Sequence, residues 1–74
     1  MSVTLFTRTA CPLCDEARDA LAGLGIVWDE VDVDGDRALR SKYGERVPVI
    51  ERDGAIVVEG NLEGVALGRL LGSG

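Results

Sequence analysis

Histidine is absent from this sequence, and cysteine occurs only twice, as Cys11 and Cys14. A structural zinc ion normally takes about four nitrogen or sulfur ligands. Two cysteines cannot complete such a site within one molecule, although two molecules could share a metal. We therefore expect the chain to hold no metal of its own.

Aromatic residues and positive charge are also scarce. The 74 residues include one Trp, one Tyr and one Phe, and the formal net charge is −5. Negative charge repels the phosphates of nucleic acids and of anionic membranes. With so few rings, the chain also has no platform on which bases could stack. We expect neither class of partner.

Long apolar runs are missing as well. No run approaches the roughly 18 residues that cross a membrane, and the N-terminal residues lack the pattern of a secretory signal. We therefore expect a cytoplasmic protein, in which a permanent disulfide is rare and a Cys-X-X-Cys pair more often cycles between oxidised and reduced forms. The length suits a single domain over residues 1–74, and we expect a monomer.

The two cysteines lie where a predicted strand turns into a predicted helix. Val3–Phe6 is rich in strand-forming residues. After the cysteines, apolar residues recur at helical spacing: Leu13, Ala17, Ala20, Leu21 and Leu24. We place Cys11 at the helix cap and Pro12 at the first helical position, where a missing N–H costs nothing.

This placement favours redox chemistry. Free backbone N–H groups and the helix dipole stabilise a thiolate at the cap. Cys11 is therefore the candidate nucleophile, and Cys14, one turn later, can resolve a mixed disulfide. The alternative, a pair of buried spectator residues, explains neither Pro12 nor the turn between strand and helix.

The middle of the chain predicts a strand, a turn and a short helix. Ile26–Val33 is the expected second strand, with Val27, Val31 and Val33 on one face. The turn at 34–36 can cap a helix that runs to Tyr43. A strand, a helix and a second strand at this spacing make a right-handed unit with parallel strands.

The last third predicts a hairpin and a final helix. Val47–Ile50 and Ala55–Glu59 are the expected strands, joined at Asp53-Gly54. Gly60-Asn61 breaks the second strand, and an amphipathic helix follows over Leu62–Leu71. The fold class is α/β, with the order β-α-β-α-β-β-α.

A group of basic side chains accompanies the second predicted helix, namely Arg37, Arg40, Lys42 and Arg46. Such charges usually form only a solvated helix face. They could instead hold an anionic substrate next to the thiols. The sequence leaves both interpretations open.

In its order of elements and its short motifs, the chain resembles the glutaredoxin branch of the thioredoxin-like superfamily. The motifs are Cys11-Pro12-Leu13-Cys14, Val47-Pro48 and the break at Gly60-Asn61. The resemblance implies a thioredoxin-like fold, a four-stranded mixed sheet flanked by helices. It also implies that Cys11 attacks a substrate disulfide, that Cys14 resolves the product, and that Pro48 is cis and faces the thiols.

The same resemblance implies a substrate-binding surface. The backbone N–H and C=O of Val47 would pair with an extended peptide or with the cysteine of glutathione. The residues expected on this surface are Arg8, Pro12, Leu13, Val47, Pro48, Gly60 and Asn61.

Three positions depart from the glutaredoxin pattern. Leu13 stands where an aromatic residue is usual, and Arg46 stands where threonine is usual. Leu62 occupies the place of an acidic residue that would hold the amine of glutathione. Disulfide chemistry is therefore better supported than glutathione specificity.

The leading hypothesis is a thiol–disulfide oxidoreductase that reduces protein disulfides or glutathione mixed disulfides. It needs no bound cofactor, and glutathione or a flavoprotein disulfide reductase would supply electrons. The second hypothesis is a redox-sensing or metal-sharing binding module on the same fold. A scaffold without chemistry is the third.

Overall fold

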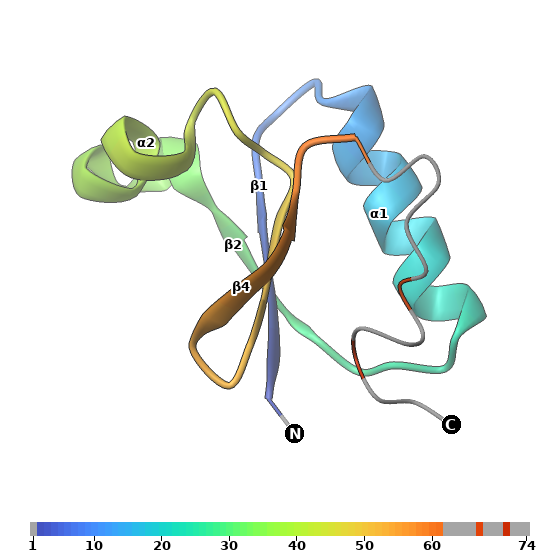
Figure 1. The fold of residues 1–74 in the computed structure, drawn as a ribbon. Helices are drawn as coiled ribbons and strands as arrows, with labels where there is room; N and C mark the ends of the chain where they lie inside the picture. The colour runs from blue at the N-terminus through green and yellow to red at the C-terminus, as the bar shows by residue number, and fades with distance from the viewer. Residues whose placement is uncertain (1, 62–66, 68–70, 72–74) are drawn as a thin grey trace.

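The computed structural model describes residues 2–61, 67 and 71 (Figure 1). The elements follow the expected order: β1 (Val3–Thr7), α1 (Pro12–Gly23), β2 (Asp29–Asp32), the 3-10 helix η1 (Val33–Gly35), α2 (Arg37–Tyr43), β3 (Val49–Arg52) and β4 (Ala55–Glu59). Most of the predicted last helix lies outside the described residues. Within it, Leu67 is helical, and its carbonyl accepts a hydrogen bond from the Leu71 N–H.

The four strands form one mixed sheet in the order β2-β1-β3-β4. The pair β1–β2 is parallel, whereas β1–β3 and β3–β4 are antiparallel. Figure 1 shows α1 and α2 on opposite sides of this sheet. The layers are thus helix, sheet and helix.

The alternation of side chains along β1 builds a core on each face of the sheet. Val3 and Leu5 pack in one cluster with Ala17 and Leu21 of α1. Phe6 points to the other face, where its ring lies 4.8 Å from that of Tyr43 at the end of α2. Because successive strand residues face opposite sides, a single central strand anchors both helices.

Helix α1 ends in a turn that contains a glycine with a left-handed backbone. Gly25 takes a positive φ of 71°, and its N–H donates to the Ala22 carbonyl. The Ile26 N–H then donates to the Leu21 carbonyl. These two bonds and the apolar contact between Ile26 and Leu21 make a Schellman end. Not all the apolar residues at helical spacing in this segment are buried, because Leu13 and Leu24 are exposed.

The predicted second strand was wrong at both ends. β2 begins at Asp29, Val27 is 89% exposed, and Val33 lies in η1. The ladder between the parallel strands runs only from Thr4↔Asp29 to Thr7↔Asp32. A segment forms a strand only where it can pair with a neighbouring strand. The length of β2 is therefore set by its pairing with β1 and not by the number of β-forming residues in the segment.

The hairpin forms where Asp53-Gly54 predicted it. Both residues have positive φ, 52° and 87°, as a two-residue turn of type I′ requires. The Ser2 backbone makes two hydrogen bonds to this turn. The Ser2 carbonyl accepts from the Asp53 N–H at 2.7 Å, and the Ser2 N–H donates to Asp53 Oδ1 at 2.8 Å. The first hairpin strand starts at Val49, two residues later than predicted.

The peptide bond between Val47 and Pro48 is cis. This confirms what the resemblance to glutaredoxins implied for that bond.

Among the residues that the structure describes, no helix is long and apolar enough to cross a bilayer.

Candidate active site

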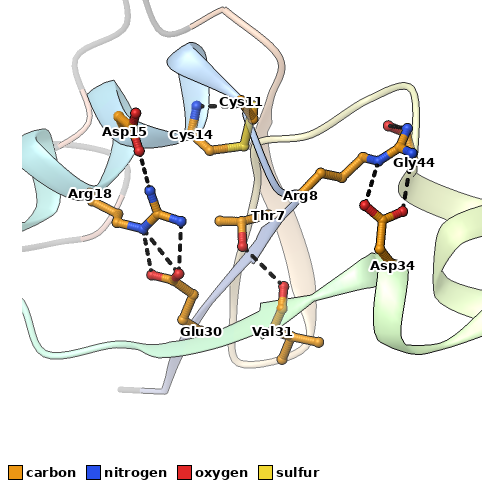
Figure 2. Close-up of a disulfide and its surroundings, with 10 residues drawn as sticks. All are labelled: Thr7, Arg8, Cys11, Cys14, Asp15, Arg18, Glu30, Val31, Asp34 and Gly44. Atoms are coloured by element: carbon orange, nitrogen blue, oxygen red, sulfur yellow. Dashed lines mark hydrogen bonds and ion pairs between the residues drawn. A yellow bond between two sulfur atoms is a disulfide. The ribbon is translucent and has the colours of Figure 1, made fainter.

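The cysteine pair occupies the turn between β1 and α1. In this structure the two sulfurs form a disulfide (Figure 2). Cys11 is the N-cap of α1 with an extended backbone, and Pro12 follows at the start of the helix. The Cys14 N–H donates to Cys11 Sγ at 3.2 Å. The predicted cap and proline positions are therefore confirmed.

The two cysteines differ in exposure. Cys14 is fully buried, with no exposed surface, whereas Cys11 is partly exposed. Pro12 and Leu13, the residues between them, are both exposed. Of the two sulfur-bearing residues, Cys11 is therefore the one open to solvent, next to the exposed apolar residues Pro12 and Leu13.

Ala10, directly before the nucleophile candidate, has a left-handed backbone with φ 57°. A non-glycine residue there is uncommon, and the conformation costs on the order of 1 kcal/mol. It turns the chain from β1 into the cap of α1. Sequence reasoning missed this feature because alanine carries no signal for positive φ.

Arg8 is held by two partners in the same chain. Its Nε donates to Asp34 Oδ2 at 3.2 Å, and its second terminal nitrogen lies 3.1 Å from Asp34 Oδ1. Its Nη1 donates to the Gly44 carbonyl at 3.1 Å. Figure 2 shows the guanidinium between these groups. Arg8 thus ties the turn ahead of the thiols to η1 and to the end of α2.

A second ionic cluster joins α1 to β2. Arg18 pairs with Asp15 and, through Nε and Nη2, with Glu30, each of these two nitrogens lying 2.9 Å from a carboxylate oxygen. Trp28 Nε1 also donates to Glu30, at 3.3 Å. The hydrogen bond from Arg18 holds the pKa of Glu30 below its ordinary value. Sequence patterns did not predict this cluster, because the pair Arg18 and Glu30 that joins its two halves is 12 residues apart along the chain.

Thr7 is the buried polar residue at the end of β1. Its hydroxyl donates to the Val31 carbonyl at 3.5 Å, a long contact that joins β1 to β2 below the cysteine turn (Figure 2). The hydroxyl therefore has a partner within the sheet.

Val47 differs from the expectation. Its N–H donates to the Tyr43 carbonyl at 3.1 Å, in the turn that follows α2. The prediction that this N–H faces a substrate was therefore wrong in this structure. The Val47 carbonyl has no partner among the described residues, so one backbone acceptor remains at this position.

Pro48 is fully buried, and its carbonyl accepts a hydrogen bond from the Gly60 N–H at 2.8 Å. Gly60 has a positive φ of 74°, which turns the chain away from β4. Asn61 follows on the surface. These residues close the end of the hairpin.

The strand register places the segments that carry the predicted site residues at the same end of the sheet, where the strands begin or finish. Phe6, near the end of β1, pairs with Val49 at the start of β3, and Val49 pairs with Glu59 at the end of β4. The cysteine turn, the cis-proline segment and Gly60 therefore leave the sheet at the same end, as Figure 1 shows.

Metal binding gains no support from the described part of the chain. Within residues 2–61, 67 and 71, no three His, Cys, Asp or Glu side chains are grouped so that they could hold an ion.

Comparison with known proteins agrees with this architecture. The family model for the glutaredoxin-like domain (DUF836) matches residues 2–72. No match was found among curated proteins.

Solved structures extend the likeness. Protein XcR50 from X. campestris is 35% identical, with 99% of both chains covered and a TM-score of 0.85. The thioredoxin-like protein BC3987 is 25% identical over 95% of this chain and 100% of its own, with a TM-score of 0.74.

A wheat glutaredoxin shares the fold, with 20% identity, 96% of this chain and 75% of its own covered, and a TM-score of 0.71. The thioredoxin-like fold predicted from the sequence is therefore confirmed. Because the family model spans nearly the whole chain, the protein belongs to the glutaredoxin-like family of the thioredoxin-like superfamily.

Proposed function

We propose that this protein is a dithiol–disulfide oxidoreductase that reduces disulfides in protein substrates. One observation carries the proposal: a partly exposed sulfur caps helix α1 and is bonded to a fully buried sulfur one turn later. An accessible sulfur can attack a substrate, and a buried neighbour can then release it.

In the first step the Cys11 thiolate attacks one sulfur of the substrate disulfide. A bond forms between Cys11 and that sulfur, the substrate S–S bond breaks, and the departing thiolate takes a proton from water. The Cys14 N–H, aimed at Cys11 Sγ, and the positive end of α1 stabilise the attacking thiolate.

In the second step Cys14 gives up its proton and attacks Cys11 Sγ. The mixed disulfide breaks, and the second substrate thiolate leaves and is protonated. The substrate has then gained two electrons and two protons. The protein is left with the Cys11–Cys14 disulfide that the structure contains.

The reduced form must be regenerated by an external donor. Two thiols of glutathione, or the dithiol of a flavoprotein disulfide reductase, would each supply two electrons. The dithiol is the redox centre, so the reaction needs no bound cofactor. We place the reaction in the cytoplasm, where such donors keep thiols reduced.

Substrate docking would use the surface around the thiols. Pro12 and Leu13 offer an exposed apolar contact, and the Val47 carbonyl offers a backbone acceptor beside Pro48. The hydrogen bond from the Gly60 N–H to the Pro48 carbonyl holds Gly60, and Asn61 after it, next to this surface. One acceptor, where the resemblance implied a donor and acceptor pair, gives a weaker strand-like contact.

Glutathione would be bound only weakly. Arg8 is engaged by Asp34 and the Gly44 carbonyl, so its charge is partly neutralised. The Val47 N–H is already bonded. Leu62 also stands where an acid would pair with the glutamyl amine. We expect protein disulfides to be reduced at least as well as glutathione-linked ones.

The test compares turnover on a glutathionylated peptide with turnover on a peptide that holds an intramolecular disulfide, with an excess of thiol reductant. The parent should reduce the intramolecular disulfide, and Leu62→Asp should raise the relative rate on the glutathionylated peptide. A parent that reduces neither substrate would overturn the proposed activity. A strong preference for the glutathionylated peptide, unchanged in Leu62→Asp, would overturn only the proposed substrate preference.

A further inference from the structure

A groove lined by charged side chains lies at the end of α2 and in the turn that follows this helix. It has a volume of about 440 Å³ and is lined by Arg40, Ser41, Lys42, Glu45 and Arg46, which we call the basic groove. Three of the five residues are cations and one is a carboxylate. No apolar side chain lines it, unlike the pockets that hold most small ligands.

The basic groove is a local reversal of the charge of the protein. Residues 37–46 carry four of the eight basic residues and one of the thirteen acidic ones. The remainder of the chain holds four basic and twelve acidic residues. A negative partner is therefore repelled by most of the molecule and attracted to this stretch.

The cations of the groove are not neutralised by carboxylates of the described chain as Arg8 and Arg18 are. The Arg40 guanidinium has no hydrogen-bond or ion-pair partner among the described residues. Lys42 Nζ lies 4.9 Å from the centre of the Tyr43 ring. Arg46 makes a long contact of 3.8 Å with Glu59. Their charge therefore remains available to a partner.

The groove is connected to the thiols through Gly44. This residue lies between Lys42 and Glu45, and its carbonyl accepts the hydrogen bond from Arg8, three residues before Cys11 (Figure 2). On the other side, Arg46 directly precedes Val47, whose carbonyl is open. The groove is thus linked to the turn ahead of the thiols and to the cis-proline segment, the two segments that the proposed docking surface uses.

We propose that the basic groove binds an acidic segment of the protein whose disulfide is reduced. The inference rests on the proposed function. Three cations spread along one groove suit several carboxylates of an extended chain better than one small anion. Each exposed contact is worth under about 1 kcal/mol, so the effect comes from several contacts together and from faster encounter.

Lys42 and Arg40 also stand in the last turn of α2, where positive charge stabilises the helix dipole. A purely structural role would change the melting temperature and leave substrate preference unaltered. The test therefore measures preference, with melting temperature beside it.

The experiment uses two synthetic peptides that share one intramolecular disulfide. One carries a run of glutamates next to the disulfide, and the other carries glutamines at the same places. At low ionic strength the parent should show a kcat/KM about tenfold higher for the glutamate peptide, and this preference should shrink at high salt. Arg40→Glu should remove most of it.

Arg37→Glu is the matched control, because it makes the same charge reversal on the same helix without lining the groove. Arg37→Glu should keep most of the preference. Equal turnover of the two peptides by the parent, or an equal loss in both variants, would overturn the proposal. Turnover of the glutamine peptide alone reports the proposed function.

A second measurement does not depend on catalysis. A linear glutamate peptide without cysteine is added to isotope-labelled protein, and backbone amide shifts are followed by NMR. Shifts should concentrate at residues 40–46 and should be lost in Arg40→Glu. Shifts elsewhere, or none, would overturn the groove assignment even if disulfide reduction fails.

Discussion

Arg8 and Asp34 form a bidentate ion pair, with nitrogen–oxygen distances of 3.2 and 3.1 Å. Both side chains are about one-third exposed, at 38% and 31%. In a pair of this kind the carboxylate offsets most of the charge of the guanidinium. The basic residue ahead of the thiols is thus directed toward the protein itself.

Asp34→Asn tests what this pair does. The pair is partly exposed, so the loss in free energy of unfolding should stay under about 1 kcal/mol. The freed Arg8 charge should raise the relative turnover of a glutathionylated peptide. Asp29→Asn removes the same charge from an exposed position on β2 and serves as the control. Identical substrate ratios in the two variants would show that Asp34 does not restrain Arg8.

Cys11 should be the first thiol modified in the reduced protein. Cys14 is fully buried and Cys11 is partly exposed at the helix cap. Brief treatment with iodoacetamide near neutral pH, followed by peptide mass spectrometry, locates the label. Earlier labelling of Cys14 would reverse the roles assigned to the two sulfurs.

Cys14→Ser should leave an attacking thiol without its resolving partner. A mixed disulfide between Cys11 and a substrate should then persist and be visible by intact mass. Cys11→Ser, as control, should form no such adduct in comparable yield. If Cys14→Ser reduces an intramolecular disulfide as fast as the parent, the two-thiol mechanism fails.

Gly44→Ala should destabilise the protein although Gly44 has an ordinary helical φ of −53°. A Cβ there would run into the Arg40 carbonyl oxygen. Forcing a methyl group into occupied space typically costs about 1–3 kcal/mol. At Gly35 an added Cβ meets nothing within 4 Å, so Gly35→Ala is the matched control in urea denaturation. Equal stability of the two variants would contradict the close approach.

Glu30 should make part of the free energy of unfolding depend on pH in the acid range. The hydrogen bond from Arg18 lowers the pKa of Glu30 from its ordinary value near 4.5, and the one from Trp28 adds to this. The folded state then binds fewer protons than the unfolded one between the two pKa values. The contribution is complete above the ordinary value and is lost as pH falls through the lowered one.

Urea denaturation of the parent and Glu30→Gln checks this sign. The parent should be more stable near neutral pH, by at most about 1 kcal/mol because the pair is partly exposed. The difference should shrink on acidification below about pH 4. A difference that grows in acid would contradict the assigned direction.

Local chemistry explains the parts of the fold that the sequence predicted. Pro12 and the Asp53-Gly54 turn each dictate a backbone conformation through their own covalent structure. The position of Cys11 at a helix cap follows from such neighbours. The elements around the thiols were therefore predictable, and their order was correct.

Other features depend on contacts between distant segments. The length of β2 is set by its ladder with β1, so Val27 was misplaced. The ion pairs of Arg8 with Asp34 and of Arg18 with Glu30 span 26 and 12 residues of sequence. The bond from the Val47 N–H to Tyr43 depends on how tightly the chain turns after α2. None of these has a signature in a single sequence.

The most direct test of the proposed activity is a single-turnover reaction between the reduced protein and an excess of a peptide with an intramolecular disulfide, with no other reductant present. The account predicts one reduced peptide per protein molecule, formed together with the Cys11–Cys14 disulfide and absent in Cys11→Ser. No reduced peptide after complete mixing, or reduction that continues unchanged in Cys11→Ser, would contradict it.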